Sequence, residues 1–233
     1  MDFSQRSYEK ELMDLGGFSE QDFLQNLQEL KYTNQLLGGH KATLYAFRQL
    51  TRDWPKTQTL HIADVGCGGG DTLRFMATYC QKKGIKARFT GIDLNPVCIA
   101  LSKQNMAGFD CDFIHAPYQE VQQNFDLILC ALFTHHLNEQ ELDHYLLWAS
   151  QHARLGIIIN DLHRHRFAWA SIWLLSRVLG LSYLYKNDAP LSVRRGFLRQ
   201  EWLAKASKLN IKLHVKWIWA FRHAIWHPTN TAS

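Results

Sequence analysis

The sequence lacks the features that mark several large classes of protein. Its five cysteines, at positions 67, 80, 98, 111 and 130, form no C-x-x-C pair, which argues against a disulfide framework and against a zinc site. No low-complexity tract or internal repeat interrupts an ordinary globular composition. The first ten residues, MDFSQRSYEK, have no apolar core of a signal peptide. We therefore expect a cytoplasmic protein without a bound metal.

The chain also lacks an apolar run long enough to cross a bilayer. The most apolar stretch, residues 167–184 (FAWASIWLLSRVLGLSYL), is interrupted by Ser176 and Arg177. Its pattern predicts a helix that is apolar on two sides, and such a helix is buried, covers an apolar ligand or touches a membrane. We expect core packing, with peripheral membrane contact as the alternative.

Charge is distributed unevenly around a net value of +5. Residues 151–233 hold thirteen Lys and Arg against three Asp and Glu, whereas residues 1–150 hold thirteen against eighteen. A basic final third could suit an acidic substrate, a membrane surface or nucleic acid. A solvated face is the simplest explanation, and we prefer it to nucleic-acid binding.

The most informative feature present is a glycine turn within HIADVGCGGGD, residues 61–71. An apolar strand pattern ends there, and a helical pattern begins at Thr72. Glycines allow the backbone to pass close to a ligand, and the free N–H groups of the helix N-terminus point toward it. A dinucleotide fingerprint, G-x-G-x-x-G/A, would require a small residue where Asp71 stands. An NAD-dependent oxidoreductase is therefore disfavoured.

Strand and helix patterns alternate along the middle of the chain. Residues 4–52 read as helices, with Ser19 at one start and Gly38-Gly39 as an interruption. Alternation of strands and helices predicts a parallel sheet with right-handed crossovers. Residues 211–227 alternate like two further strands after a helix at 201–210. The other expected strands are 60–65, 87–92, 111–115, 126–131 and 156–160, and the other expected helices are 71–83, one after Pro96, and 138–152.

The glycine turn resembles motif I of the class I S-adenosylmethionine (SAM) methyltransferases, because Asp64 stands two residues before the first glycine of D-x-G-x-G-x-G. The segments ELMD, NQLLGGHKAT, CALFTHHL, INDLHRHR and APLSVRRGF are also similar to a UbiE-like bacterial subgroup that methylates small molecules. The resemblance extends over nearly the whole chain. It implies an α/β, Rossmann-like sheet of seven strands, mostly parallel, with a C-terminal antiparallel hairpin.

The same resemblance implies one domain in four parts. Residues 1–55 would form an N-terminal helical cap, 56–160 the SAM-binding core, 161–200 a helical insertion on the acceptor side, and 201–233 the final helix and hairpin. The segment from Asn34 to Gly39 would close over the cofactor.

The cofactor residues follow from the motif and from the strand ends. The glycines would supply close backbone approach, Asp64 would orient the turn or the methionine ammonium, and Asp93, at a strand end, would accept both ribose hydroxyls. Where the family commonly has an acid near the adenine amine, this chain has Ala116, which leaves that role to backbone groups or to His115. The expected cofactor contacts are Asp64, Gly66, Cys67, Gly68, Gly70, Asp71, Thr72, Asp93, Leu94, Ala116, Pro117, Cys130, Ala131 and Leu132.

Histidines are the candidate catalytic groups. His163, His136 and His135, in that order of preference, could take a proton from a phenolic or enolic acceptor, because an imidazole titrates near neutral pH. The resemblance implies SAM as the donor, S-adenosylhomocysteine (SAH) as the product, and a small acceptor of phenolic, polyketide-like or lipid-like character. We expect O-methylation; C-methylation of a quinone-type ring and a non-catalytic SAM-binding partner protein are the alternatives.

Methylation of nucleic acid is not expected. CALFTHH, which follows the fourth strand, lacks the [DN]-P-P-[YFW] motif of base amino-group methylation, and the chain has no Pro-Cys nucleophile for cytosine C5. The sequence leaves the oligomeric state open.

Overall fold

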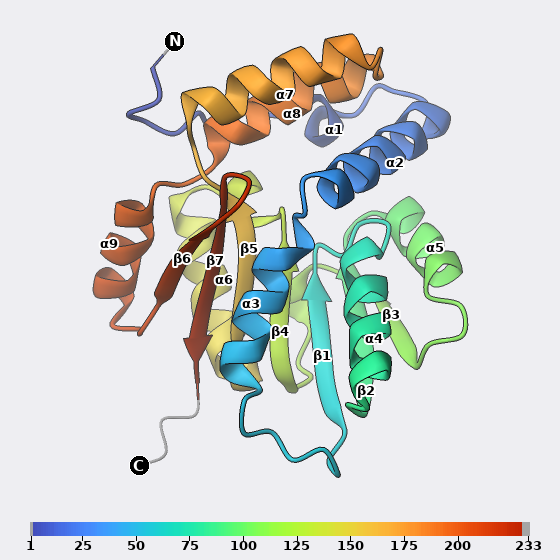
Figure 1. Ribbon diagram of the computed structural model, residues 1–233, viewed down its shortest axis with the longest axis vertical. Coiled ribbons are helices and arrows are strands. Elements are labelled where there is room, and N and C mark those ends of the chain that lie inside the picture. Colours follow the sequence, from blue (N-terminus) through green and yellow to red (C-terminus); the bar gives the residue numbers. More distant parts are fainter. Residues whose placement is uncertain (1, 230–233) are drawn as a thin grey trace.

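The computed structural model describes residues 2–229 and contains one seven-stranded sheet with helices on both faces (Figure 1). The strands are β1 (Leu60–Val65), β2 (Ala87–Asp93), β3 (Cys111–His115), β4 (Phe125–Ala131), β5 (Ala153–Leu162), β6 (His214–Ile218) and β7 (Arg222–Pro228). The α-helices are α1 (Leu12–Leu15), α2 (Glu20–Leu36), α3 (His40–Leu50), α4 (Asp71–Lys83), α5 (Pro96–Asn105), α6 (Glu139–His152), α7 (Arg166–Val178), α8 (Tyr183–Arg195) and α9 (Arg199–Leu209). Two short 3-10 turns are η1 (Tyr118–Glu120) and η2 (Thr134–His136).

The strand order β3-β2-β1-β4-β5-β7-β6 confirms the predicted topology. Strands β1 to β5 pair in parallel, and β7 runs antiparallel to both β5 and β6. From β1 the chain continues to β2 and β3 on one side of the sheet and then crosses to β4 and β5 on the other side of β1. Ligands of open α/β sheets bind at such a switch point, outside the carboxyl ends of the strands.

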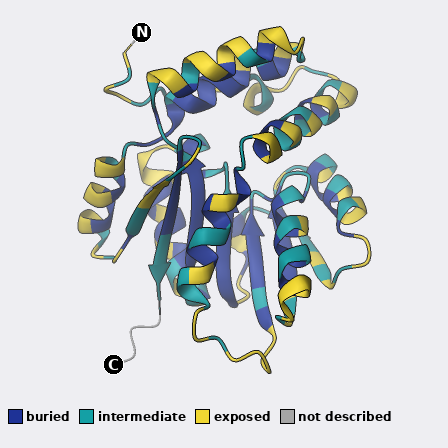
Figure 2. Ribbon diagram, in the orientation of Figure 1, coloured by how far each residue is buried: buried dark blue, intermediate teal, exposed yellow. Residues whose placement is uncertain are grey.

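Two apolar layers cover the sheet. Side chains of α3, α4 and α5 pack on one face, around residues such as Phe47, Leu73 and Ile99. Side chains of α6 and α9 pack on the other, around Tyr145 and Trp202. The central strands are buried on both faces (Figure 2), as expected for parallel strands that read as continuous apolar runs.

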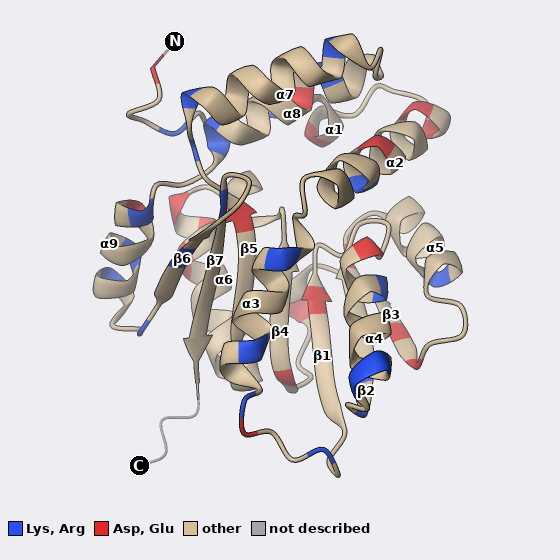
Figure 3. Cartoon of the chain, in the orientation of Figure 1, with Lys and Arg blue, Asp and Glu red and all other residues tan. Residues whose placement is uncertain are grey.

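Helices α1, α2, α7 and α8 form a cap above the carboxyl ends of the strands (Figure 1). Ile172 of α7 and Tyr185 of α8 belong to a small apolar core of the cap, which Leu30 of α2 also contacts. The cap therefore joins the two regions predicted as N-terminal cap and helical insertion. Figure 3 shows acidic residues at the ends of β1 and β5 beneath it, where Asp64 and Asp161 lie.

The insertion differs from the single helix expected over 167–184. Helix α7 ends at Val178, the chain turns at Gly180 with a φ of +61°, and Ser182 caps a second helix, α8. The prediction of one helix was wrong because apolar residues continue through the turn. Pro190 lies inside α8, where proline usually argues against a helix. Within residues 2–229, no helix is both long and apolar enough to span a membrane.

Residues 2–18 are mostly irregular rather than helical. The segment lies along the cap because the Arg164 guanidinium donates to the carbonyls of Phe3 and Ser4. Only α1 interrupts it, and Asp188 of α8 accepts from the backbone N–H groups of Leu12 and Met13 at 2.8 and 3.0 Å. Ser19 caps α2 with a reciprocal capping box, as its position predicted.

Candidate active site

A cavity of about 970 Å³ lies between the carboxyl ends of the strands and the cap. Its floor is formed by the glycine turn after β1 and by residues at the ends of β2 and β4. Its walls come from α2, α7 and α8 and from the β6–β7 connection. It therefore occupies the position at which this sheet topology places ligands.

The glycine turn has the backbone geometry that its sequence predicted. Gly66, Gly68 and Gly70 have φ values of +68°, +53° and +75°, which L side chains rarely adopt. A Cβ atom on Gly66 would lie 2.5 Å from the ring of Phe133. Gly66 and Gly68 line the cavity, and so do Cys67, Asp71 and Thr72 of the predicted set; Gly70 lies outside the lining and starts α4.

Asp93 is held at the end of β2 by two backbone donors. Its Oδ2 accepts from Gly68 N at 2.9 Å, and its Oδ1 accepts from Asn95 N at 2.8 Å. Burial raises its pKa in spite of these bonds. The carboxylate lines the cavity and retains lone pairs for ligand hydroxyls.

Asp64 is a buried carboxylate without a cation. It is 1 % exposed, and no partner in the described part of the chain bonds its Oδ1. Burial, together with the charges of Asp71 and Asp93, raises its pKa well above the usual range. Since a buried charge is costly unless paired, this site suits a cationic ligand group.

Arg222, at the start of β7, is a site residue that the sequence analysis missed. It lines the cavity, is 5 % exposed, and donates to Asn34 Oδ1 at 3.0 Å, while its Nη1 bonds nothing within residues 2–229. Burial lowers its pKa to about 10, which leaves it charged at neutral pH. Asn34, from the segment predicted to close over the cofactor, lies 3.4 Å from Asp71.

The exits of β3 and β4 meet the expectations in part. Ala116 and Leu94 line the cavity, whereas Pro117 and His115 do not; Gln119 lines it and carries an amide that the sequence analysis did not single out. At β4, Ala131 and Leu132 line the cavity. Cys130 lies in the buried core instead, because alternate residues of a strand face opposite sides.

The three candidate histidines occupy two different places. His135 and His136, in η2, line the cavity. His163 does not; its ring packs 4.8 Å from that of His223 and 5.6 Å from that of His165. The structure therefore brings two of the three to the predicted cofactor residues.

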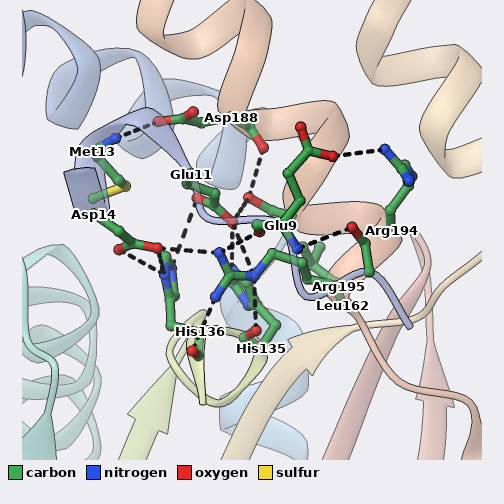
Figure 4. A network of polar contacts seen from close by, with 12 residues as sticks. Glu9, Glu11, Met13, Asp14, His135, His136, Leu162, Asp188, Arg194 and Arg195 are labelled. Atoms are coloured by element: carbon green, nitrogen blue, oxygen red, sulfur yellow. Dashed lines mark hydrogen bonds and ion pairs between the residues drawn. The ribbon is translucent and has the colours of Figure 1, made fainter. Parts of the chain in front are cut away.

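A network of charged groups holds the histidine pair (Figure 4). His135 Nδ1 lies 2.7 Å from Asp161 Oδ1, and His136 Nδ1 lies 3.1 Å from Asp14. Burial alone would lower the pKa of His136, but the charges of Glu11 and Asp14 outweigh it and raise the value. Arg195 donates to Asp14 at 3.1 Å and to the carbonyl of His135 at 3.0 Å, which ties η2 to α8.

The rest of the cavity is largely apolar. Leu27 and Leu30 of α2, Ile172 and Leu175 of α7, Ala189 and Val193 of α8, and Trp219 and Phe221 of the β6–β7 connection line it. This wall can accept an aromatic or aliphatic molecule beside the histidine pair.

Comparison with known proteins agrees with this geometry. Residues 62–156 match the sequence model of a family described as "Methyltransferase domain". The matched segment contains the glycine turn, Asp93 and the histidine pair. No curated protein matches the chain.

Several solved methyltransferases share the fold. The plantazolicin methyltransferase BpumL in complex with SAH is 15% identical, with a TM-score of 0.68 over 94% of this chain and 93% of that one. The magnesium protoporphyrin IX methyltransferase ChlM from Synechocystis PCC 6803, with bound SAM, is 11% identical, with a TM-score of 0.57 over 85% and 83%. The citrinin polyketide synthase CMeT domain is 15% identical, with a TM-score of 0.58 over 79% and 50%. The chain has the Rossmann-like fold of these methyltransferases.

Proposed function

We propose that the chain is a SAM-dependent methyltransferase of the UbiE-like kind that methylates an oxygen of a small, apolar acceptor of phenolic, enolic or polyketide-like type. One observation carries the proposal: a single cavity joins the glycine turn and Asp93 to a histidine pair under an apolar cap. The match to a methyltransferase-domain family and the SAH-bound and SAM-bound structures of similar fold support it.

The residues of the cavity fit SAM group by group. Asp93 would accept the ribose hydroxyls, and the backbone at Gly68, where a Cβ atom would meet nothing within 4 Å, leaves room for the nucleoside. The methionine end of SAM carries one ammonium and one carboxylate. Asp64, with an unpaired carboxylate oxygen, and Arg222, with an unpaired guanidinium nitrogen among the described residues, supply the complementary charges.

Bound SAM supplies a methyl group that its sulfonium already activates, so the protein contributes alignment, exclusion of water and removal of a proton. Ala131 and Leu132, which line the cavity at the exit of β4, would contact the methionine portion of SAM. The acceptor oxygen bonds to the methyl carbon, and the electron pair of the broken S–C bond stays on sulfur. The hydroxyl proton leaves beside His135 and His136, which line the cavity, rather than beside His163.

The test is transfer of a tritiated methyl group from SAM to a panel of phenols, quinols and polyketide lactones, with SAH and NAD binding measured by calorimetry. We expect SAH to bind, NAD not to bind, and at least one phenolic or enolic compound to be labelled on oxygen. Binding of NAD alone would end the proposal. Label on ring carbon would favour C-methylation, and SAH binding with no labelled product across the panel would favour a non-catalytic SAM-binding protein.

A further inference from the structure

Three ligand atoms converge at the wall of the cavity that α1 and α8 cover. Glu11 comes from the segment before α1, and His135 and His136 come from η2 (Figure 4). His135 Nε2 lies 3.6 Å from Glu11 Oε1, and His136 Nε2 lies 3.9 Å from Glu11 Oε2. One ligand atom from each residue lies within 4.8 Å of the other two. Ligands about 2.1 Å from a zinc ion at tetrahedral angles lie about 3.4 Å apart, so these separations need only a small contraction.

The imidazoles are oriented as metal ligands usually are. Nδ1 of His135 faces Asp161 and Nδ1 of His136 faces Asp14, and a carboxylate can only accept, so each Nδ1 carries the proton. Both Nε2 atoms face Glu11, and a bound cation would displace any proton from them and take up their lone pairs together with the carboxylate. A histidine that ligates a metal characteristically donates its other N–H to a carboxylate in this way.

Two of the three ligand residues are buried, and His136 is partly exposed, with 21 % of its side chain accessible. Glu11 is 1 % exposed and His135 is 2 % exposed. Ser192 Oγ lies 2.8 Å from Glu11 Oε1, but no hydrogen bond from elsewhere in residues 2–229 reaches Glu11 Oε2 or either Nε2 atom. These atoms therefore remain available to one shared ligand.

The surrounding charge favours a divalent cation. Glu11, Asp14 and Asp161 contribute three carboxylates, and Arg195 is the cation of the described chain that pairs with this group, at 3.1 Å from Asp14 and 3.9 Å from Glu11. Arg6, which donates to the carbonyl of His135, has Glu139 as its own ion-pair partner. Before the imidazoles are counted, the three carboxylates and Arg195 carry a net charge of −2, which one divalent ion neutralises.

We propose that Glu11, His135 and His136 bind one divalent transition-metal ion through the glutamate carboxylate and the two Nε2 atoms. Two imidazoles and a carboxylate suit zinc and similar ions, and three protein ligands leave a position open. Because all three residues line the cavity, the open position faces the space assigned to the acceptor. If the chain is the methyltransferase proposed above, an acceptor hydroxyl is the ligand class for that position, and a bound cation would favour its ionisation with loss of the proton to solvent. The two histidines would then hold the metal instead of acting as free bases.

The experiment titrates the chelator-treated full chain with Co²⁺, followed by visible absorption, and with Zn²⁺ in competition. We expect one ion per chain. Glu11→Gln and His136→Asn should each weaken Co²⁺ binding at least about a hundredfold. Asp14→Asn keeps all three ligands and changes the carboxylate that orients His136, so it should weaken binding by about tenfold to a hundredfold. The control is His144→Asn, which removes an exposed histidine of α6 and should leave binding unchanged.

Two results overturn the metal site: absence of stoichiometric Co²⁺ binding by the wild-type chain, or binding that Glu11→Gln and His136→Asn leave unchanged. In either case two protons, rather than a metal, balance the charge of the cluster. Circular dichroism checks that each variant folds, and Glu11→Gln is nearly isosteric should His136→Asn unfold. SAH binding is measured on the metal-free wild type, so loss of the metal site and loss of the methyltransferase assignment give different results.

Discussion

At the residue scale, the proposed SAM site depends most on Asp93. Replacing it with alanine removes the acceptor of the ribose hydroxyls and also frees Gly68 N and Asn95 N. Hydrogen bonds to a charged group contribute roughly 1.5–3 kcal/mol each. We therefore expect Asp93→Ala to weaken SAH binding at least about tenfold, which corresponds to the loss of one such bond. Calorimetry measures it, with exposed Asp53→Ala as the control. Equal affinity in the two variants would remove Asp93 from the cofactor site.

The pKa of Asp93 adds a pH dependence to the same measurement. Burial raises it above the usual aspartate value, so in the free protein the carboxylate takes up a proton at a higher pH than a surface aspartate does. Affinity for SAH should therefore be full above that raised pKa and fall as the pH drops through it. Asp93→Ala should lose this part of the pH dependence.

Arg222 allows a ligand-binding role to be separated from a structural one. Replacing a buried, poorly paired cation with an apolar side chain is often neutral or stabilising. We expect Arg222→Met to leave the melting temperature of the free protein unchanged or higher, yet to weaken SAH binding at least tenfold, on the order of one lost charge-assisted contact. Arg222→Lys keeps the charge and should retain part of the affinity. A variant that melts lower and binds SAH normally would show a purely structural arginine.

The sequence predicted those residues of the cavity lining that lie close together along the chain. Asp64, Gly66 and Gly68 belong to one turn, and Asp93 ends the next strand, so a local pattern was sufficient. Glu11 and Arg222 could not be found in this way, because they reach the cavity only through docking of the N-terminal segment and pairing of β7 with β5. His163 follows β5 directly, yet its side chain falls outside the cavity, and sequence position alone does not give that direction.

At the scale of elements, one carboxylate of α8 fixes the start of α1. Asp188 accepts from two backbone N–H groups at the start of α1, and it is 2 % exposed. Asp188→Asn replaces one acceptor with a donor that faces an N–H group. Leaving a buried group unsatisfied costs about 1–3 kcal/mol, so we expect residues 9–16 to exchange amide hydrogens faster.

Hydrogen exchange followed by mass spectrometry measures this effect, and Asp110→Asn, at an exposed loop position, is the control. Asp188→Asn should also weaken Co²⁺ binding, because Glu11 lies on the loosened segment. Unchanged protection of residues 9–16 would mean that other contacts, such as those of Arg195, suffice to hold α1.

The helices and strands were predictable where the apolar residues follow one clear pattern, either that of a strand or that of a helix. Strands β1 to β4 and helix α4 fall within one residue of their expected bounds, because buried strands and capped helices have strong local signals. Strand β5 extends beyond its expected ends through Leu162, where pairing with β7 continues the ladder. Helix α8 was not anticipated, since its apolar face is defined by contacts with α2 and α7 rather than by a separate pattern.

At the scale of the whole molecule, the cavity lies between the sheet and the cap. Its floor belongs to the sheet and its walls to the cap, so a ligand that fills it contacts both. A ligand at a hundred times its dissociation constant stabilises the folded state by about 2.7 kcal/mol. For a chain of this length we expect SAH at that concentration to raise the melting temperature by about 5–10 °C.

Hydrogen exchange with and without SAH locates that stabilisation. We expect slower exchange in the glycine turn and also in α2 and the following loop to Gly39, because Asn34 connects Asp71 to Arg222 above the cavity. Helix α9 and strand β6 contribute nothing to the cavity lining and serve as the internal control. Protection confined to the glycine turn would show that the cap does not close on the cofactor, and its ordering would then have to come from the acceptor.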